Sequence, residues 1–549
     1  MTSDELSNYY SDLLDGSYDC VDRIVLNGYF GLAYSAGGFR SWWRQLHGGS
    51  DDKLDNAHLI RMAGRFGRRV RGWARASGVP VIDCDREERQ HEIAAAHLKK
   101  NPNVRGVFLV LVGRAVATVW DVKRSPQGVI QNLQTKRPYN NHYSFHIMDP
   151  DWGHLTIKVA GHPPFGAQIM LNGHEYVACQ ARKAGLSFAK EGNCFTGVSM
   201  PAELAKVADT LSEARMIGRL SQLCERWIYT SCLCFALDLD EQQRSGFHYT
   251  YSVYQVEYSR NFIFHLGGQM EQVFQGLIDR TRARLNVKRL KTLFGMKTRP
   301  YRKRKGKAPR CEVVVEIPSY DLTIFKLHFG KLTLKMYTKG ERVLRIEVIV
   351  HNTQALRCGR RLERFPQIVV RLHAILEQFL DNVYCMDAAF ISDETLNQLP
   401  DPSRVGKTRV GGIDVNKPRT RVVLRAALAL ACAPDGFTAG QLAQAVQSMP
   451  GPAHFTYDTR RAAYDLKKLR GKDLVSKLDN SHRYRVPPQA IRMIAALVIL
   501  REKVLRPILA GVGNPRMGRK PKTWSPTDEH YEAIRQNMFT LMDDLRIAA

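Results

Sequence analysis

Four runs of alternating apolar and polar residues between positions 311 and 352 constrain the fold of this chain more than any other feature. The runs are EVVVEI, LTIFKLHF, KLTLKMYT and VLRIEVIV, and short polar segments separate them. A period of two places successive side chains on opposite faces of a strand. Because short connections join strands that pair antiparallel, the segment predicts an antiparallel β meander.

The last two runs also predict which side chains share a face. Pairing the apolar positions of one strand with those of the next fixes the parity of the register. The polar residues Lys335, Tyr337, Arg345 and Glu347 then lie together on the other face. Such a set suits phosphoryl transfer, in which Tyr337 attacks, Glu347 holds a divalent metal ion and the cations offset phosphate charge. The alternative is a solvent face with cross-strand ion pairs.

Other acidic residues could contribute metal ligands. Asp22 precedes a predicted strand at 23–26, and Asp149 and Asp151 lie in a turn. Together with Glu347 they are candidate ligands for Mg²⁺ or Mn²⁺ in phosphodiester cleavage. A turn or capping role is the alternative for each. His174, which follows the turn signal Asn172-Gly173, is either a general base or a hydrogen-bonded turn histidine.

Helical periodicity is clearest at residues 56–75. Apolar residues recur there every three or four positions, which predicts one buried helix face. The other faces carry arginines, among them the candidate nucleic-acid contacts Arg65, Arg68 and Arg69, with Arg61, Arg71 and Arg75 beside them. Such a helix could lie along a phosphate backbone or present a solvated face. Residues 107–119 predict a β-hairpin around 113–114, and residues 201–294 are mostly helical in pattern.

Residues 420–510 predict a winged helix. Helices are expected at 420–433, 439–447 with Thr438 as N-cap, and 456–470, followed by paired strands at 474–477 and 483–486 and a helix at 489–505. In the third helix Ala462, Ala463, Leu466 and Leu469 are expected to pack inward. Candidate contacts on this helix are Arg460, Arg461, Tyr464, Lys467 and Lys468, and those on the wing are Lys477, His482, Arg483 and Arg485.

The charge balance indicates a polyanionic partner. The chain has 549 residues with 81 Lys plus Arg against 53 Asp plus Glu, a formal net charge of +28. The stretch 297–310 is almost wholly basic, and its Arg302, Lys303, Arg304 and Lys305 could grip phosphate or belong to a linker. Since there is no P-loop, dinucleotide glycine fingerprint or GxSxG elbow, nucleotide hydrolysis and acyl transfer are disfavoured.

These observations predict an α+β multidomain protein with a mixed or antiparallel β core, basic helical insertions and a C-terminal winged helix. The expected divisions are an α/β domain with an Arg-rich helix at 1–135, a β-rich core segment at 136–200, a helical domain at 201–296, a basic arm with the meander at 297–398, a linker at 399–419, the winged helix at 420–510 and a basic tail with a helix at 511–549. Scattered cysteines and an acidic start predict a cytoplasmic protein without a membrane segment, and an oligomer is compatible with the sequence.

Three resemblances add to this interpretation. Residues 420–510 resemble winged helices of the MarR type. The segment KMYTKGERVLRIEV resembles the Y-D-K and R-x-E region of rolling-circle replication initiators, which nick DNA through a tyrosine and a bound metal ion, although Thr338 stands where they carry Asp. More broadly, DRIVLNGYF, YQVEYSRNFIF and the segment at 149–176 resemble a family of uncharacterised, multi-copy bacterial proteins that suggest mobile elements, in which Asp stands at the position of Asn261.

The sequence therefore favours a nucleic-acid-binding protein of a bacterial mobile element that holds DNA or a structured RNA through the winged helix and the basic arms. The alternative is a metal-dependent nicking enzyme or nuclease of the replication-initiator or transposase kind, so the sequence leaves open whether the chain is an enzyme. A third reading is a transcriptional regulator that uses only the winged helix.

Overall fold

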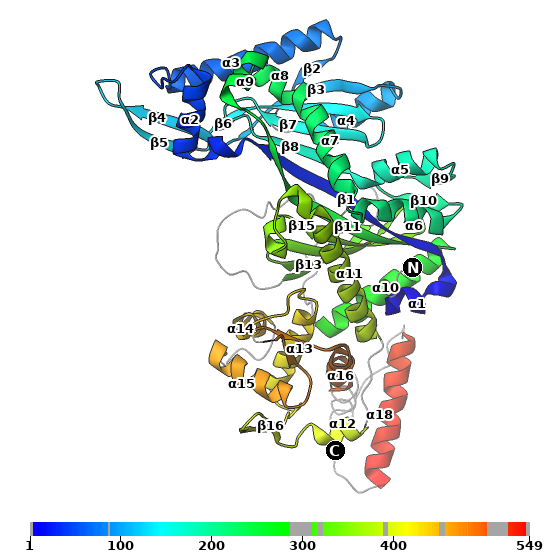
Figure 1. Ribbon diagram of the computed structural model, residues 1–549. Coiled ribbons are helices and arrows are strands. Elements are labelled where there is room, and N and C mark those ends of the chain that lie inside the picture. The colour runs from blue at the N-terminus through cyan, green and yellow to red at the C-terminus, as the bar shows by residue number, and fades with distance from the viewer. Residues whose placement is uncertain are drawn as a thin grey trace. The chain divides into compact units, whose positions relative to one another are not determined.

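The computed structural model describes residues 4–85, 88–285, 310–316, 322–387, 393–449, 456–479, 481–501 and 525–544. The chain is an α+β protein with a large mixed sheet, which confirms the predicted class. It divides into two compact units (Figure 1). Unit 1 comprises Met1–Asp12, Glu271–Gly330 and Glu377–Ala549, and unit 2 comprises Leu13–Met270 and Lys331–Leu376.

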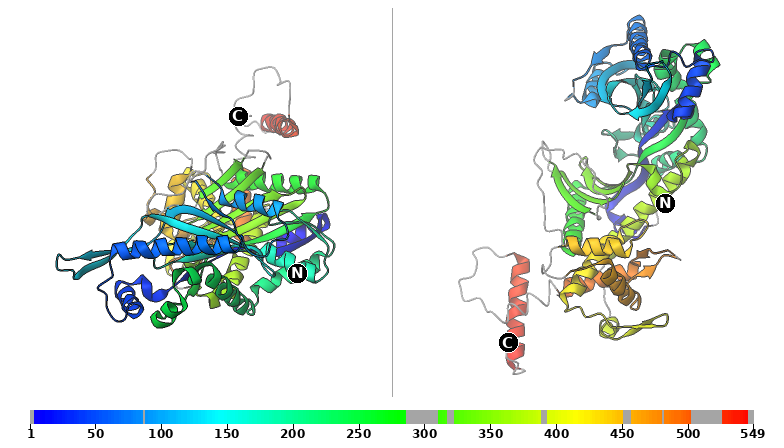
Figure 2. Two further views of the ribbon diagram at one scale, coloured as in Figure 1. Left: turned by 90° about the horizontal axis from the view of Figure 1, so that it is seen from above. Right: turned by 90° about the vertical axis from the view of Figure 1, so that its left-hand side faces the viewer.

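The sheet of unit 2 runs in the order β14, β15, β11, β1, β8, β7, β6, β3, β2 and twists strongly (Figure 2). These strands are β14 Leu332–Lys339, β15 Val343–Val350, β11 Thr250–Phe264, β1 Leu14–Tyr29, β8 Ala167–Asn172, β7 Gly153–Ala160, β6 Tyr139–Asp149, β3 Gly106–Val116 and β2 Val81–Asp83. The β2 and β3 strands pair parallel, whereas β1 pairs antiparallel with both β11 and β8. A separate hairpin joins β4 Val119–Arg124 and β5 Ile130–Lys136.

One expectation for this unit is confirmed only in part, and a second is wrong. The segment 201–294 contains the strand β11, whose sequence TYSVYQVEYSRNFIF is rich in the aromatic and β-branched residues that favour strands. The predicted hairpin around 113–114 is instead the single strand β3, in which Gly113 lies opposite His142 of β6. Gly113 is not among the residues with the positive φ that a two-residue hairpin turn requires.

Helices of unit 2 cover the sheet. They are α2 Ala36–Leu46, α3 Asn56–Ala76, α4 Gln90–Lys100, α5 Gly173–Lys183, α6 Pro201–Asp209, α7 Met216–Ile228, α8 Cys234–Ala236 and α9 Leu239–Ser245, with α10 Gly267–Leu285 and α11 Phe365–Asp387 beginning in this unit. The α3 helix matches the predicted one, and its Phe66 ring lies 5.2 Å from that of Tyr143 on β6. Gly67 permits this contact, because a Cβ there would lie 2.5 Å from the Tyr143 hydroxyl.

Unit 1 contains α1 Glu5–Tyr9, the hairpin of β12 Arg310–Glu316 and β13 Leu322–Phe329, α12 Asp393–Gln398, and the small hairpin of β16 Ser403–Val405 and β17 Thr408–Val410. Then follow α13 Pro418–Ala431, α14 Ala439–Ser448, α15 Thr459–Arg470, β18 Ser476–Lys477, β19 Tyr484–Arg485 and α16 Pro488–Ile499, and later α18 Pro526–Asp544. Thr438 caps α14 as predicted. The assignment of these elements to a winged helix stays a prediction. Within the described ranges, no helix has the length and apolar character needed to cross a membrane.

Burial of an imidazole gives unit 2 a testable response to acid. His146 on β6 is buried, with Nδ1 3.0 Å from Nε2 of His154. Burial, and then the neighbouring His154, lower the pKa of His146 from 6.5 to about 3. Between these values the unfolded chain binds a proton that the folded chain does not. The free energy of unfolding should therefore fall as the pH decreases from 6.5 towards 3.

We predict that His146→Gln flattens this pH dependence, whereas the exposed control His91→Gln keeps the slope of the wild type. Urea unfolding followed by tryptophan fluorescence measures it, because every tryptophan except Trp524 lies in unit 2. Equal slopes for the two variants would show that His146 is not neutral in the folded state.

Candidate functional site

One face of four neighbouring strands in unit 2 gathers polar side chains. In β14 and β15, Lys335 lies opposite Glu347 and Tyr337 opposite Arg345, which confirms the predicted register parity. The next strand places Ser259 opposite Glu347 and Asn261 opposite Arg345. The strand after that, β1, adds Tyr18 and Cys20 opposite Asn261 and Ser259. These residues and their neighbours Asp22, Glu257 and His174 are called the polar sheet face below.

A bulge in β1 directs Asp22 towards this face. Val21 lies opposite Tyr258, whereas Ile24 lies opposite Val256, so β1 contributes one extra residue between these pairs. Such bulges re-aim a side chain and increase the local twist. Asp22, at the bulge, is only 1% exposed.

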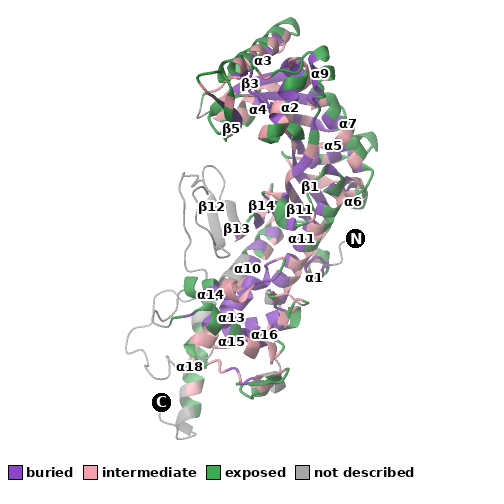
Figure 3. Cartoon of the chain, turned by 60° about the vertical axis from the view of Figure 1, so that its left-hand side comes forward, coloured by how far each residue is buried: buried purple, intermediate pink, exposed green. Residues whose placement is uncertain are grey.

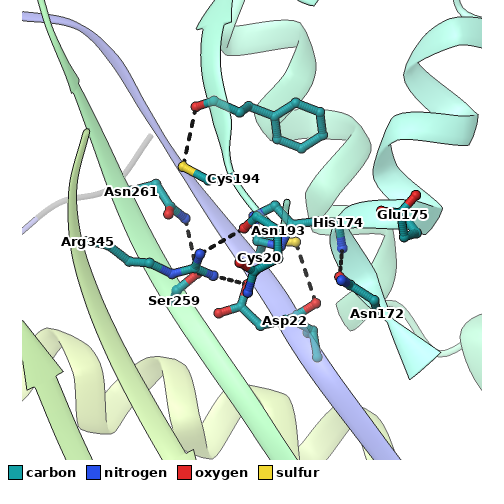
Figure 4. A network of polar contacts seen from close by, with 12 residues as sticks. Cys20, Asp22, Asn172, His174, Glu175, Asn193, Cys194, Ser259, Asn261 and Arg345 are labelled. Carbon is teal, nitrogen blue, oxygen red and sulfur yellow. Dashed lines mark hydrogen bonds and ion pairs between the residues drawn. The ribbon is translucent and has the colours of Figure 1, made fainter. Parts of the chain in front are cut away.

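Asp22 forms an ion pair with Arg345, which is fully buried (Figure 4). The Arg345 guanidinium also donates to the backbone carbonyl of Asn193 (2.7 Å) and to the Ser259 hydroxyl (3.0 Å). Burial alone would raise the pKa of Asp22, but the charge of Arg345, together with His174, lowers that pKa to about 2. The pair therefore stays ionised in the interior.

His174 meets the same carboxylate from the first turn of α5. Its Nδ1 lies 2.8 Å from Asp22 Oδ1, and its Nε2 lies 3.3 Å from the Tyr18 hydroxyl, which accepts from the Phe195 backbone N–H (3.0 Å). Gly173 makes this approach possible, because a Cβ there would lie 1.7 Å from the Val21 carbonyl oxygen. Burial is the main cause that lowers the pKa of His174 to about 4, so the ring is neutral at pH 7.

A second group lies beside this buried layer, and all its members except the buried Glu347 are more accessible. Lys335 Nζ donates to Glu347 (3.0 Å), and the Gln255 amide donates to Glu257 (2.8 Å). Glu257 is a diagonal neighbour of Glu347, and burial and the charge of Glu347 raise the pKa of Glu257. Burial and the same Glu347 hold the pKa of Tyr337 well above its usual range. Glu257, Lys335 and Tyr337 are half-buried, unlike Asp22 and Arg345.

The polar sheet face contains one group of residues that could hold a metal ion. Cys20, Asp22 and His174 each place one ligand atom within 4.8 Å of the others, and thiolate, carboxylate and imidazole suit zinc. Arg345 already contacts Asp22, however, so a cation there would meet a positive charge in a buried site. The other carboxylates of this face are those of Glu257 and Glu347, and oxygen ligands suit Mg²⁺ and Mn²⁺, although Lys335 already contacts Glu347 (3.0 Å).

The predicted metal set does not converge. Asp22 and Glu347 share the polar sheet face, but Asp149 and Asp151 lie at the β6–β7 turn, and β7 is separated from β15 by β8, β1 and β11. Neighbouring strands lie about 5 Å apart, so β7 and β15 are separated by roughly 20 Å. Asp149 accepts from the backbone N–H groups of Asp151 (2.9 Å) and Trp152 (3.0 Å), as a turn residue does. It also accepts from the Trp227 indole (2.8 Å), which ties the turn to α7.

Asp151 pairs with Lys183 of α5. Both aspartates line a polar cavity of about 330 Å³ between the β6–β7 turn, α5 and α7, together with Tyr176, Arg219 and Arg226. The backbone hydrogen bonds that Asp149 accepts fit the alternative of a turn role for this residue.

The nucleic-acid candidates of unit 1 have unequal surroundings. On α15, Ala462, Leu466 and Leu469 are buried as predicted, whereas Ala463 is exposed. The candidates Arg460, Tyr464, Lys477, His482 and Arg485 are exposed, and Lys467 and Lys468 are half-buried. Lys468 Nζ lies 5.9 Å from the centroid of the Tyr464 ring.

Three of these arginines donate hydrogen bonds within the chain. Arg485 Nε donates to the Ser476 hydroxyl (3.2 Å). Arg461 donates to Thr456, which precedes α15. Arg483 donates to the carbonyl oxygens of Asp435 (2.6 Å) and Gly436 (2.8 Å) and so holds the turn between α13 and α14.

The candidates on α3 divide in the same way. Arg65 forms a bidentate ion pair with Glu241 (2.8 and 3.1 Å), and Arg69 lies 3.7 Å from Asp238. Both arginines therefore link α3 to α9. Arg68 is exposed. The remaining candidates, Arg302, Lys303, Arg304 and Lys305, lie outside the described residues.

Sequence reasoning missed how the polar sheet face is completed. It singled out Asp22, Arg345 and His174 separately, but it did not join them. The signal was the pair Asn172-Gly173, which begins a helix instead of a hairpin: Asn172 caps α5 by accepting from the His174 N–H (2.9 Å). Asn193, Ser259 and Tyr18 carry no spacing that would have marked them.

The Asp22–Arg345 pair predicts a large loss of stability when one partner is removed. Asp22→Ala leaves a buried guanidinium uncompensated, which typically costs about 3–5 kcal/mol. We expect the double variant Asp22→Ala/Arg345→Met to recover part of the loss in urea unfolding. Glu203→Ala, which breaks the exposed Glu203–Lys206 pair, is the control and should change stability little. If Asp22→Ala costs no more than this control, the pair does not contribute as described.

No family model matches this chain, and neither a curated protein nor a solved structure matches it.

Proposed function

We propose that this protein binds nucleic acid through a basic surface formed by α15 and the β18–β19 hairpin of unit 1. The observation that carries the proposal is the arrangement of exposed Arg460 and Tyr464 on α15 with Lys477, His482 and Arg485 on the hairpin that follows. Within the described residues, Arg460 has no carboxylate partner. The overall charge of +28 supports a polyanionic ligand.

The order of elements supports a winged helix-turn-helix. Three helices, α13, α14 and α15, precede a hairpin, and Phe437 between α13 and α14 pairs with Tyr484 of that hairpin (N–H to O distances of 2.8 and 2.7 Å). In helix-turn-helix proteins the recognition helix enters the major groove and its first residues contact base edges. By this analogy Arg460 contacts a base or phosphate, and the hairpin contacts the flanking backbone. DNA and a structured RNA are both ligands that this proposal allows, and the resemblance to multi-copy bacterial proteins supports a role in a mobile element.

We expect Arg460→Gln/Tyr464→Ala to weaken binding to the preferred site by about 1–3 kcal/mol, since a base-reading residue has this magnitude. A filter-binding titration against sites selected from a random duplex pool measures the effect. The control Arg89→Gln removes one charge that an exposed ion pair with Glu92 already satisfies. Equal affinity of the two variants for the selected site would contradict a recognition role for α15.

As a second candidate, we propose that the polar sheet face supports metal-dependent strand cleavage. Tyr337, Lys335 and Glu347 share this face with Glu257 on the adjacent strand. Tyr337 would supply the attacking oxygen, Glu257 and Glu347 would hold Mg²⁺ or Mn²⁺, and Lys335 would offset phosphate charge. Arg345 is better described as a positioning residue here, because its guanidinium is engaged by Asp22, Ser259 and the Asn193 carbonyl.

This second candidate predicts a covalent protein–DNA adduct with Mn²⁺ that is absent from Tyr337→Phe. Denaturing electrophoresis of labelled single-stranded and supercoiled DNA, with and without chelator, detects the adduct. Tyr139→Phe, at an exposed tyrosine, is the control and should retain it. An adduct that persists in Tyr337→Phe would remove the tyrosine from this role, while nucleic-acid binding would be unaffected.

A further inference from the structure

The outer side of α3 in unit 2 carries a strip of arginines. On a helix, positions seven apart lie almost above one another, so Arg61, Arg68 and Arg75 form one line with steps of about 10 Å. All three are exposed. Figure 3, which is coloured by burial, shows exposed residues along α3. Within the described part of the chain, none of the three pairs with a carboxylate. These residues are called the α3 strip below.

The composition of α3 separates this strip from an ordinary solvated face. Its sequence, NAHLIRMAGRFGRRVRGWARA, contains no Asp or Glu. Exposed helices usually place acids three or four residues from cations, whereas like charges at this spacing destabilise the helix. Here Arg71 follows Arg68 by three residues and precedes Arg75 by four. Of these three arginines, Arg71 alone pairs with a described carboxylate, that of Asp83 (2.6 Å). A row of repelling charges retained on one face indicates an external anion that compensates them.

The glycines of the helix support the same conclusion. A side chain at position 67 would collide with Tyr143, which explains Gly67. Gly64 leaves room for the Arg68 guanidinium, which would lie 3.3 Å from a Cβ at position 64. Gly72 has no such reason, since a Cβ would meet no described atom within 4 Å. Glycine inside a helix costs stability relative to alanine. At the edge of the α3 strip, however, it lowers the helix surface and lets a backbone approach closely.

We infer that the α3 strip binds the phosphate backbone of a double-stranded nucleic acid without reading its sequence. The inference rests on the proposed function and adds a second contact surface to it, in a unit other than the one that carries α15. The assignment also corrects which arginines of α3 would do so: Arg65 and Arg69 hold the helix to α9, and Arg61, Arg68 and Arg75 face outward. A duplex carries one negative charge per about 1.7 Å of its axis, twice the density of one of its strands.

The test is the salt dependence of binding to a 30-base-pair duplex of random sequence between 50 and 200 mM NaCl. The variant Arg61→Gln/Arg68→Gln/Arg75→Gln should reduce the slope of log K against log salt by roughly 2.7, that is, about 0.9 for each lost phosphate contact. The control Lys99→Gln/Lys100→Gln/Lys123→Gln removes the same charge from other exposed positions of unit 2 and should keep the slope of the wild type. The variant Arg61→Lys/Arg68→Lys/Arg75→Lys should keep it too, which attributes the effect to the charge at these positions, and circular dichroism of the glutamine variant should match that of the wild type.

Each outcome decides between the proposals. If the wild-type chain binds no nucleic acid, the proposed function fails. If it binds and the slope of the glutamine variant is unchanged, the α3 strip is not a contact surface while the proposed function stands. If the chain prefers a single strand of equal length over the duplex, the assignment of a duplex to the α3 strip is overturned.

Discussion

The buried ion pair between Asp22 and Arg345 is the interaction around which unit 2 is organised. Its partners come from β1 and β15, which are separated in the sheet by β11, so the pair spans three strands. Two opposite charges in the interior are tolerated when they contact each other closely and further hydrogen bonds satisfy their remaining polar atoms. The bulge in β1, the close approach allowed by Gly173, and the acceptors at Ser259 and Asn193 meet this requirement in part, whereas Asp22 Oδ2 and Arg345 Nε have no hydrogen-bond partner among the described residues.

The opposite face of the same strands carries a second buried pair. Arg260 donates to both carboxylate oxygens of Asp19 (2.7 and 2.8 Å), and the Tyr258 hydroxyl donates to the same group (2.9 Å). His373 of α11 lies 3.2 Å from it. Because the two pairs lie on opposite faces, a one-residue slip of β1 against β11 would move each carboxylate away from its arginine. The pairs therefore specify the register of the central strands.

How far the sequence predicted this arrangement depends on the range of each signal. Local sequence patterns were sufficient to predict the α3 helix, the register parity of β14 and β15, and the N-cap of α14, because each depends on neighbours within a few residues. The same patterns did not predict the strand β11 or the continuous strand β3. Gly113 continues its strand because β6 pairs along the whole length of β3, and β6 is distant in sequence. Long-range pairing also explains why Asp22, His174 and Arg345 could each be named as candidates but not joined.

The same arrangement limits what the polar sheet face can do chemically. Its inner layer, Asp22, Arg345 and His174, is joined by mutual contacts and is buried away from a substrate. Its outer layer, Glu257, Lys335 and Tyr337, is half-buried, and there an incoming phosphate or metal ion would meet groups that can still exchange partners. If this face acts on nucleic acid, the outer layer would contact the reacting groups, and the inner layer would hold the outer residues in position. Loss of an inner residue would then affect stability first, whereas loss of Tyr337 would affect cleavage alone.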